Sequence, residues 1–163
     1  MIRVVLMGVS GCGKSSVGAA LAARTGMAYR DGDDLHSGAA VAKMRAGVPL
    51  TDEDRWPWLD RVARVLRDEA PIIIGCSALR RVYRDRIRSG AGAVQFVHLA
   101  GCRAVIEARM AARAGHYMPV SLLDSQFATL EPPGPEEAVT VDIDQPLEAL
   151  VSEIILKLAG DAA

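Results

Sequence analysis

The alternation of apolar runs and helical patterns along the chain predicts strands that alternate with helices. Five short, largely apolar runs indicate strands; the first is rich in β-branched residues, and the continuous run Ile72–Ile74 is typical of a strand buried on both faces. The predicted strands are Ile2–Met7, Met27–Arg30, Ile72–Ile74, Val94–Leu99 and Val139–Asp142. This order is typical of a three-layer α/β fold, in which a five-stranded parallel sheet carries helices on both faces. In such a fold we expect ligands at the carboxyl ends of the strands.

Apolar residues at helical spacing fill most of the chain between these strands. Gly26 is a typical helix stop, and Thr51 with Asp54 forms a weak capping box for a helix that runs to Glu69. Pro57 is expected in the first turn of that helix, because a proline deeper inside would break it. The helices are predicted over residues 16–24, 35–47, 51–69, 79–88, 102–114 and 146–158.

The stretch from about residue 114 to residue 135 interrupts this alternation with several glycines and prolines. Loops of this length inside a compact domain are commonly functional, so we predict a mobile lid over a binding site. The whole chain, residues 1–163, is expected to form one domain that is long enough to bury a core.

Composition and charge narrow the class of protein. The formal net charge of −1 offers no basic surface for nucleic acid or for an anionic membrane. No apolar run approaches the length that spans a bilayer, and the N-terminus reads as a first strand rather than a signal peptide. The three cysteines lack C-x-x-C spacing, which disfavours a disulfide framework or a zinc site and favours the reducing cytoplasm.

Gly8–Ser15 is a complete G-x-x-x-x-G-K-[ST] phosphate-binding loop between the first strand and the first helix. Its glycines let backbone N–H groups converge on phosphate oxygens, and the helix N-terminus adds partial positive charge. Lys14 should reach the β- and γ-phosphates of ATP, and the Ser15 hydroxyl should ligate Mg²⁺. A glycine-rich turn that binds nothing is the alternative, which the complete motif disfavours. The predicted ATP-binding residues of this segment are Gly8, Ser10, Gly11, Cys12, Gly13, Lys14, Ser15 and Ser16.

A phosphate-binding loop alone does not define the reaction. The sequence contains no N-K-x-D stretch, the motif with which GTPases recognise guanine, and this argues against a GTPase switch. Ile72–Ile74 is followed by Gly75-Cys76-Ser77, whereas a motor or AAA-type ATPase should place an acidic residue there. The remaining reading is a kinase that acts on a small acceptor.

Asp31 and Asp33 are the predicted carboxylates of such a kinase. They lie two residues apart at a strand end, so they should share one face that points towards the phosphate-binding loop. Asp31 would hold Mg²⁺, through water, and Asp33 would accept the proton of the acceptor hydroxyl. The alternative is a solvated acidic turn, since Asp-Gly-Asp-Asp is also good turn sequence.

Basic residues form a second group of candidates. Arg80 and Arg84 lie one helical turn apart and would hold an acceptor carboxylate. Arg109 and Arg113 lead into the predicted lid, from which one of them would reach the transferring phosphoryl group. Arginines that merely solvate their helices are the alternative at each position.

The histidines and tryptophans differ in their expected surroundings. His36 follows the acidic turn and His116 opens the lid, so both can face the cleft. His98, inside an apolar strand, is expected in the core. Trp56 and Trp58 are expected to cover the core, with a substrate contact as the alternative.

Taken together, these residues resemble the gluconate kinases of the bacterial, shikimate-kinase-like type within the nucleoside-monophosphate-kinase fold group. The D-G-D-x-x-H, C-S-A-L and lid signatures carry the resemblance more specifically than the phosphate-binding loop does. The matching stretches are Met7–Ser15, Asp31–His36, Pro49–Arg55, Pro57–Leu59, Cys76–Arg80, Tyr83–Asp85, Arg113, Gly115–Pro119, Leu122–Glu131 and Val141–Pro146.

The resemblance implies ATP-dependent phosphorylation of D-gluconate at its 6-hydroxyl, giving 6-phosphogluconate and ADP, with Mg²⁺ required. It also implies a mobile lid and, commonly, a homodimer. Lys14, Asp33 and Arg113 would be catalytic, and Arg109 would lie on the nucleotide side. Positions matching the acceptor site are Asp33, His36, Arg55, Arg80, Arg84 and His116. Cys12 stands where a small hydroxyl residue is common, and Arg80 where lysine is common.

Two other functions stay open at this point. A kinase for shikimate or a nucleoside monophosphate is one, although shikimate-type sites usually bring a glycine-rich stretch where Cys76-Ser77-Ala78 stands. The other is a regulatory nucleotide-binding protein without turnover, which the intact Lys14, Ser15, Asp31 and Asp33 disfavour.

Overall fold

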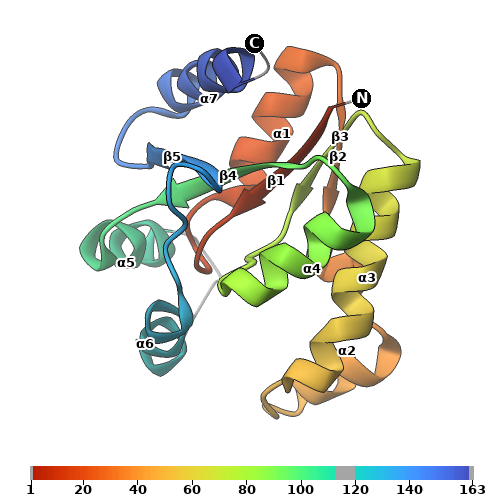
Figure 1. The fold of residues 1–163 in the computed structure, drawn as a ribbon. Helices are drawn as coiled ribbons and strands as arrows, with labels where there is room; N and C mark the ends of the chain where they lie inside the picture. Colours follow the sequence, from red (N-terminus) through yellow and green to blue (C-terminus); the bar gives the residue numbers. More distant parts are fainter. Residues whose placement is uncertain (1, 113–119, 162–163) are drawn as a thin grey trace.

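A five-stranded, fully parallel sheet forms the centre of the protein (Figure 1). The structure is a computed structural model that describes residues 2–112 and 120–161. The strand order is β2-β3-β1-β4-β5, which confirms the predicted parallel α/β sheet. The strands are β1 (Arg3–Met7), β2 (Ala28–Asp31), β3 (Ile72–Gly75), β4 (Gln95–Ala100) and β5 (Ala138–Asp142).

Helices cover both faces of the sheet. Val4 and Leu6 of β1 pack into one core cluster, and the alternate residues Val5 and Met7 pack into the other. The first face is covered by α1 (Lys14–Thr25), α5 (Arg103–Ala111) and α7 (Leu147–Asp161), and the second by α3 (Asp52–Asp68) and α4 (Arg81–Ala91). The isoleucines of β3 are fully buried, as a strand covered on both faces should be. None of the described helices is both long and apolar enough to span a membrane.

The ends of the helices follow the predicted signals, except at Pro57. Gly26 ends α1 in the left-handed conformation with a φ of 77°. Thr51 Oγ1 accepts from the Asp54 N–H and the Asp54 carboxylate accepts from the Thr51 N–H, which completes the capping box. Pro57 is the sixth residue of α3 and therefore lies in its second turn, so the predicted first-turn position is wrong. It is tolerated because Pro57 and Glu53 are exposed, where water can bind the carbonyl that lacks its helical donor.

The helix predicted over residues 35–47 is shorter in the structure, and a separate turn precedes it. A 3₁₀ turn, η1 (Gly32–Leu35), comes first, and α2 (Gly38–Arg45) follows. The Asp31 side chain accepts from the Asp33 N–H and starts η1, and the Ser37 side chain accepts from the Ala40 N–H and starts α2. Two side-chain caps so close together divide the segment.

The predicted lid, residues 114–135, is described only in part. Arg113 and His116 lie outside the described residues. Residues 120–129 form α6 (Val120–Thr129), and Glu131 then donates its backbone N–H to the Leu79 carbonyl over 2.7 Å. The chain thus returns from α6 directly to the loop that follows β3.

Candidate active site

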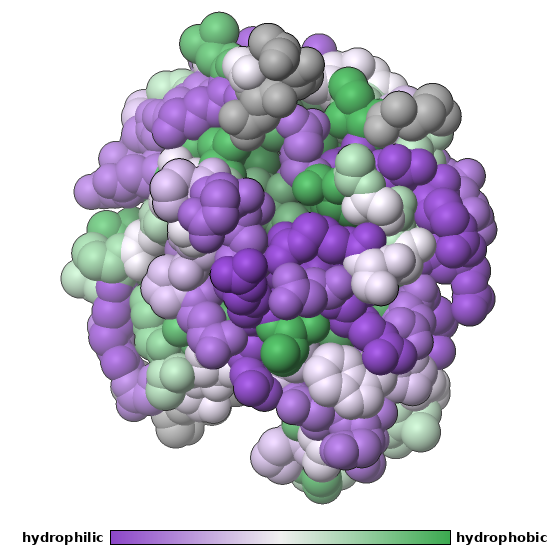
Figure 2. All heavy atoms as spheres, in the orientation of Figure 1, coloured by the Kyte–Doolittle hydropathy of each residue, from purple (hydrophilic) through white to green (hydrophobic). Residues whose placement is uncertain are grey.

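A cleft of about 780 Å³ opens at the carboxyl ends of the strands. Its walls come from the phosphate-binding loop, the end of β2, the loop between α2 and α3, and α6. Figure 2 shows the surface notched between α2 and α6, at the lower edge of the view. A binding site at this edge of the sheet is the one that the strand order predicts.

The phosphate-binding loop has the conformation of an anion site. Gly11 and Gly13 have φ angles of 83° and 99°, in the region that favours glycine, and Gly13 begins α1. A Cβ at Gly11 would also lie 2.7 Å from the Met110 side chain of α5, which would have to move aside. The N-terminus of α1 therefore presents unpaired N–H groups and partial positive charge to the cleft.

The predicted nucleotide residues divide into two groups. Ser10, Gly11, Gly13, Lys14 and Ser15 line the cleft, whereas the other three predicted loop residues do not. The residues outside the lining are Gly8, Cys12 and Ser16.

Gly8 and Cys12 support the loop on the side away from the cleft, and Lys14 bonds to the loop carbonyls from within the cleft. The Gly8 N–H donates to the Ser77 carbonyl over 3.2 Å. Cys12 is fully buried, and this burial raises the pKa of its thiol. Lys14 Nζ donates to the Gly8 and Val9 carbonyls at 2.9 and 3.2 Å, so its ammonium lies at the mouth of the loop.

Asp31 and Asp33 face the phosphate-binding loop across the cleft, as their spacing predicts. Asp31 ends β2 beside Gly75, and its Oδ1 accepts from the Asp33 N–H over 2.9 Å. The Asp33 side chain is open to the cleft, yet desolvation and the Asp31 carboxylate raise the pKa of Asp33. The acidic segment is thus a turn that also lines the site, so the two alternatives for it are compatible.

The donor set at this point fits Mg²⁺. Ser15, Asp31 and Asp33 bring hydroxyl and carboxylate oxygens to one cavity, and Mg²⁺ prefers oxygen ligands. The described residues contain no group of three or more His, Cys, Asp or Glu side chains that could enclose a metal ion. This suits an ion that keeps several waters and takes further ligands from bound phosphates.

Beside the opposite wall, one carboxylate holds two guanidinium groups, of which that of Arg55 lines the cleft and that of Arg80 does not. Arg80 donates to Asp52 Oδ2 over 3.1 Å, and the Tyr83 hydroxyl donates to Asp52 Oδ1 over 2.6 Å. Arg55 lies 3.6 Å from the same Oδ1 and lines the cleft. The hydrogen bond from Tyr83 and the two arginines lower the pKa of Asp52, which is therefore ionised at neutral pH. Sequence reasoning missed Asp52 and Tyr83, because only the fold brings α3 and α4 together.

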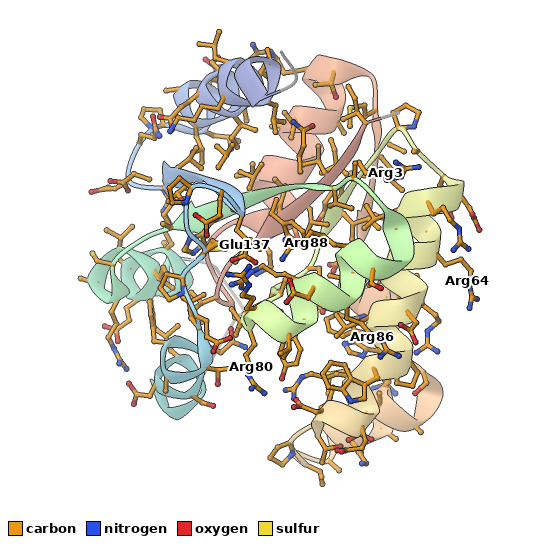
Figure 3. The ribbon with its side chains drawn as sticks, viewed as in Figure 1. Arg3, Arg64, Arg80, Arg86, Arg88 and Glu137 are labelled. Atoms are coloured by element: carbon orange, nitrogen blue, oxygen red, sulfur yellow. The ribbon has the colours of Figure 1, made fainter. Side chains whose placement is uncertain are left out.

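Arg84 does not belong to this wall, and its predicted role in acceptor binding is corrected. Only 1% of its side chain is exposed, and its Nε donates to Glu137 over 2.6 Å. Its other nitrogens donate to the Ala78 and Glu131 carbonyls. Arg80 precedes α4 in extended backbone, so the two side chains do not share a helix face. Figure 3 shows Glu137 and Arg88 together beneath α4, while Arg80 lies at the start of that helix.

His36 lines the cleft beside Trp58, with the two rings stacked 4.2 Å apart. Burial, together with Arg61 and Arg55, lowers the pKa of His36, so the imidazole is neutral at pH 7. Trp58 donates its ring N–H to the Gly32 carbonyl over 2.7 Å and thereby ties α3 to the acidic turn. Trp58 is buried, as predicted, but it also lines the site. His98 is buried in β4, as predicted.

Arg109 lies beside the phosphate-binding loop, although it does not line the cleft. Its guanidinium donates to the Ile143 carbonyl, just after β5. It also approaches Gly13, where an added Cβ would lie 3.9 Å from the nearer guanidinium nitrogen. Its role in nucleotide binding stays a prediction, as do those of Arg113 and His116.

Comparison with known proteins shows to which family the chain belongs. A family model described as an AAA domain matches residues 4–133. The chain is 45% identical to the thermoresistant gluconokinase of Escherichia coli, over 93% of this chain and 90% of that protein. The crystal structure of a gluconokinase from Sinorhizobium meliloti superposes with a TM-score of 0.90 at 48% identity, covering 97% of this chain and 91% of the other. The chain belongs to the gluconokinase family.

A solved structure of much lower sequence identity shares the fold of this chain. Shikimate kinase from Aquifex aeolicus superposes with a TM-score of 0.66 at 17% identity, over 99% of this chain and 98% of that one. At this identity the likeness shows a shared fold only. The match to a model described as an AAA domain agrees with the sequence argument for a kinase, since the relatives matched over most of the chain are gluconokinases.

Proposed function

We propose that the protein transfers the γ-phosphoryl group of ATP to the 6-hydroxyl of D-gluconate, giving 6-phosphogluconate and ADP, with Mg²⁺ as the cofactor. One observation carries the proposal. In a chain of the gluconokinase family, a single cleft joins a complete phosphate-binding loop to a wall that bears Asp33 and Arg55.

The phosphate side would act through preorganised charge. The N–H groups at the start of α1 bind the phosphates, and Lys14 exchanges the carbonyls of its own loop for phosphate oxygens. Ser15 and Asp31 would hold Mg²⁺, which neutralises charge on the phosphates during transfer. Because phosphoryl transfer needs positioning more than covalent help, these groups suffice on this side.

The acceptor side would orient gluconate by its carboxylate. Arg55 and Arg80 supply guanidinium forks that suit a carboxylate, and Asp52 fixes both of them. The sugar-acid chain then runs past His36 towards Asp33, which accepts the proton of the 6-hydroxyl. As that proton leaves, the oxygen bonds to the γ-phosphorus and the bond to the β-phosphate oxygen breaks. The raised pKa of Asp33 makes it a better proton acceptor than an ordinary aspartate.

The remaining assignments rest on the resemblance. Arg113 would stabilise the transferring phosphoryl group and His116 would contact the acceptor, while Arg109 would bind the nucleotide. A single domain is proposed from the length of the chain, a cytoplasmic location from its cysteines, a mobile lid over residues 114–135 from its glycines and prolines as well as the resemblance, and a homodimer from the resemblance alone. Light scattering of the purified protein measures the last of these directly.

Acceptor-dependent release of ADP tests the proposal. The assay supplies Mg²⁺ and ATP with gluconate, related sugar acids, shikimate or nucleoside monophosphates. We expect release with gluconate and little with the others. Release with shikimate or a nucleoside monophosphate instead would support the assignment of the phosphate-binding residues and contradict gluconate as the acceptor. Nucleotide binding without release of ADP would favour a regulatory protein.

A further inference from the structure

Gln126 joins α6 to the phosphate-binding loop across 116 residues of sequence. The backbone N–H of Ser10 donates to Gln126 Oε1 over 2.7 Å, and both residues line the cleft. The bond engages the backbone of the loop rather than a side chain, so it acts on the shape of the loop itself.

The first half of the loop is held from three directions. The Gly8 N–H donates to Ser77 after β3, the Gly8 and Val9 carbonyls accept from Lys14, and the Ser10 N–H donates to Gln126. Ser10 immediately precedes Gly11, where the backbone turns into the left-handed region. The orientation of the Ser10 peptide therefore sets the direction in which the following N–H groups point.

α6 is itself fixed to both walls of the cleft. Leu123 is 2% exposed and belongs to the same core cluster as Val9 and Cys12 of the loop. Just beyond α6, Glu131 accepts from the Arg81 N–H and donates its own N–H to the Leu79 carbonyl, each over 2.7 Å. Gln126 thus extends from a helix that is anchored on the acceptor side and reaches the loop on the phosphate side.

We propose that Gln126 is a positioning residue, which holds the Ser10 peptide from α6 and keeps the phosphate-binding loop in the shape that binds nucleotide. An amide suits this role, because its oxygen accepts from an N–H without placing a negative charge beside the phosphates. The proposal rests on the nucleotide part of the proposed function and does not depend on the identity of the acceptor.

The test compares Gln126→Met, which keeps the length of the side chain and removes the acceptor oxygen, with Gln126→Glu, which retains an acceptor. Hydrogen exchange of the Ser10 amide is measured by NMR on nucleotide-free protein, and ADP affinity by calorimetry. In Gln126→Met we expect exchange about tenfold faster and an ADP dissociation constant about tenfold higher, the effect of one lost hydrogen bond. In Gln126→Glu the Ser10 amide should stay protected.

Asp124→Asn is the matched control. Asp124 lies on α6, as Gln126 does, and the substitution breaks its ion pair with Arg103 of α5; neither partner lines the cleft. We expect its ADP affinity to equal that of the wild type. Unchanged Ser10 exchange and ADP affinity in Gln126→Met would overturn the proposal, as would an equal loss of affinity in Asp124→Asn. Since neither readout uses an acceptor, failure of gluconate phosphorylation would leave this test decisive.

Discussion

The phosphate wall of the cleft is built from consecutive residues and backbone N–H groups, whereas the acceptor wall is built from side chains of separate segments. Gly8–Ser15 carries the phosphate wall almost alone. On the acceptor wall, Asp33 ends up beside groups from α3 and from the start of α4, which ion pairs and a tyrosine hydroxyl hold together. A loop of backbone N–H groups suits the phosphates of any nucleoside triphosphate, whereas a wall of placed side chains suits the discrimination of acceptors. Specificity should therefore be lost on the acceptor wall without loss of nucleotide binding.

Lys14→Ala should have the largest effect on activity, because it removes the main side-chain charge of the phosphate wall. We expect kcat/KM to fall on the order of 10³-fold, or about 4 kcal/mol of transition-state stabilisation. Steady-state kinetics measures the loss. Lys157→Ala on α7, whose ammonium contacts the Thr140 carbonyl and Glu153 outside the cleft, is the control. Unchanged turnover in Lys14→Ala would contradict the assignment of the loop.

Arg84→Met tests whether Arg84 supports the fold rather than the acceptor. The substitution leaves Glu137 buried with Arg88 as its remaining partner, so we expect the free energy of unfolding to fall by about 3 kcal/mol. Urea denaturation measures that fall. In the folded fraction, KM for gluconate should stay within about twofold of the wild type, well below the cost of a lost charged hydrogen bond. A large rise in that KM with unchanged stability would support the assignment of Arg84 to the acceptor site.

Asp33→Asn separates proton transfer from nucleotide binding. We expect kcat to fall about 10²-fold, the usual contribution of a general base, while the affinity for ADP changes little. In the wild type, activity should decline as the pH falls through the raised pKa of Asp33, and the Asn variant should lose that acid limb. A pH profile of kcat/KM for both proteins measures this. An unchanged profile would show that Asp33 only positions the hydroxyl.

The same raised pKa predicts the direction of a stability change. A carboxyl whose pKa is higher in the folded state binds a proton more readily there, so stability falls as the pH rises from the unfolded pKa to the folded one. Above that window the charged carboxylate destabilises the fold. Asp33→Asn should therefore raise Tm at pH 7 while it lowers activity. A scan at acidic pH should show a smaller difference, and a lower Tm at pH 7 would contradict the sign.

Asp52→Asn gives the smallest and most selective effect. Arg55 and Arg80 would keep their charges and lose the carboxylate that orients them, so we expect KM for gluconate to rise about fivefold with KM for ATP unchanged. Asp60→Asn is the matched control, since Asp60 also joins α3 to α4, through Arg86, and neither residue of that pair lines the cleft, whereas Arg55 does. Equal effects of the two variants would assign Asp52 a purely structural role.

These differences also explain what the sequence could predict. The five strands and the phosphate-binding loop follow from contiguous patterns, and so does the placement of Asp31 and Asp33 at a strand end. Arg84 was misplaced because helical spacing from Arg80 assumes that both residues belong to the helix, whereas Arg80 precedes it.

Contacts between distant segments had no sequence signal. Asp52 meets Tyr83, and Gln126 meets Ser10, only after the sheet has brought their elements together. Pro57 was misplaced for a different reason, since its tolerance in the second turn depends on exposure to water that periodicity alone does not show. Local geometry is thus predictable here, while the connections across the cleft require the fold.

The position of the phosphoryl group on the product tests the central claim most directly. The product of a reaction with gluconate, ATP and Mg²⁺ is examined by proton-coupled phosphorus NMR. Transfer to the terminal CH₂–OH predicts a phosphate ester signal split by the two methylene protons rather than by one proton, accompanied by stoichiometric ADP. An ester on a secondary hydroxyl, or inorganic phosphate alone, would contradict an acceptor wall that directs the 6-hydroxyl of gluconate to Asp33.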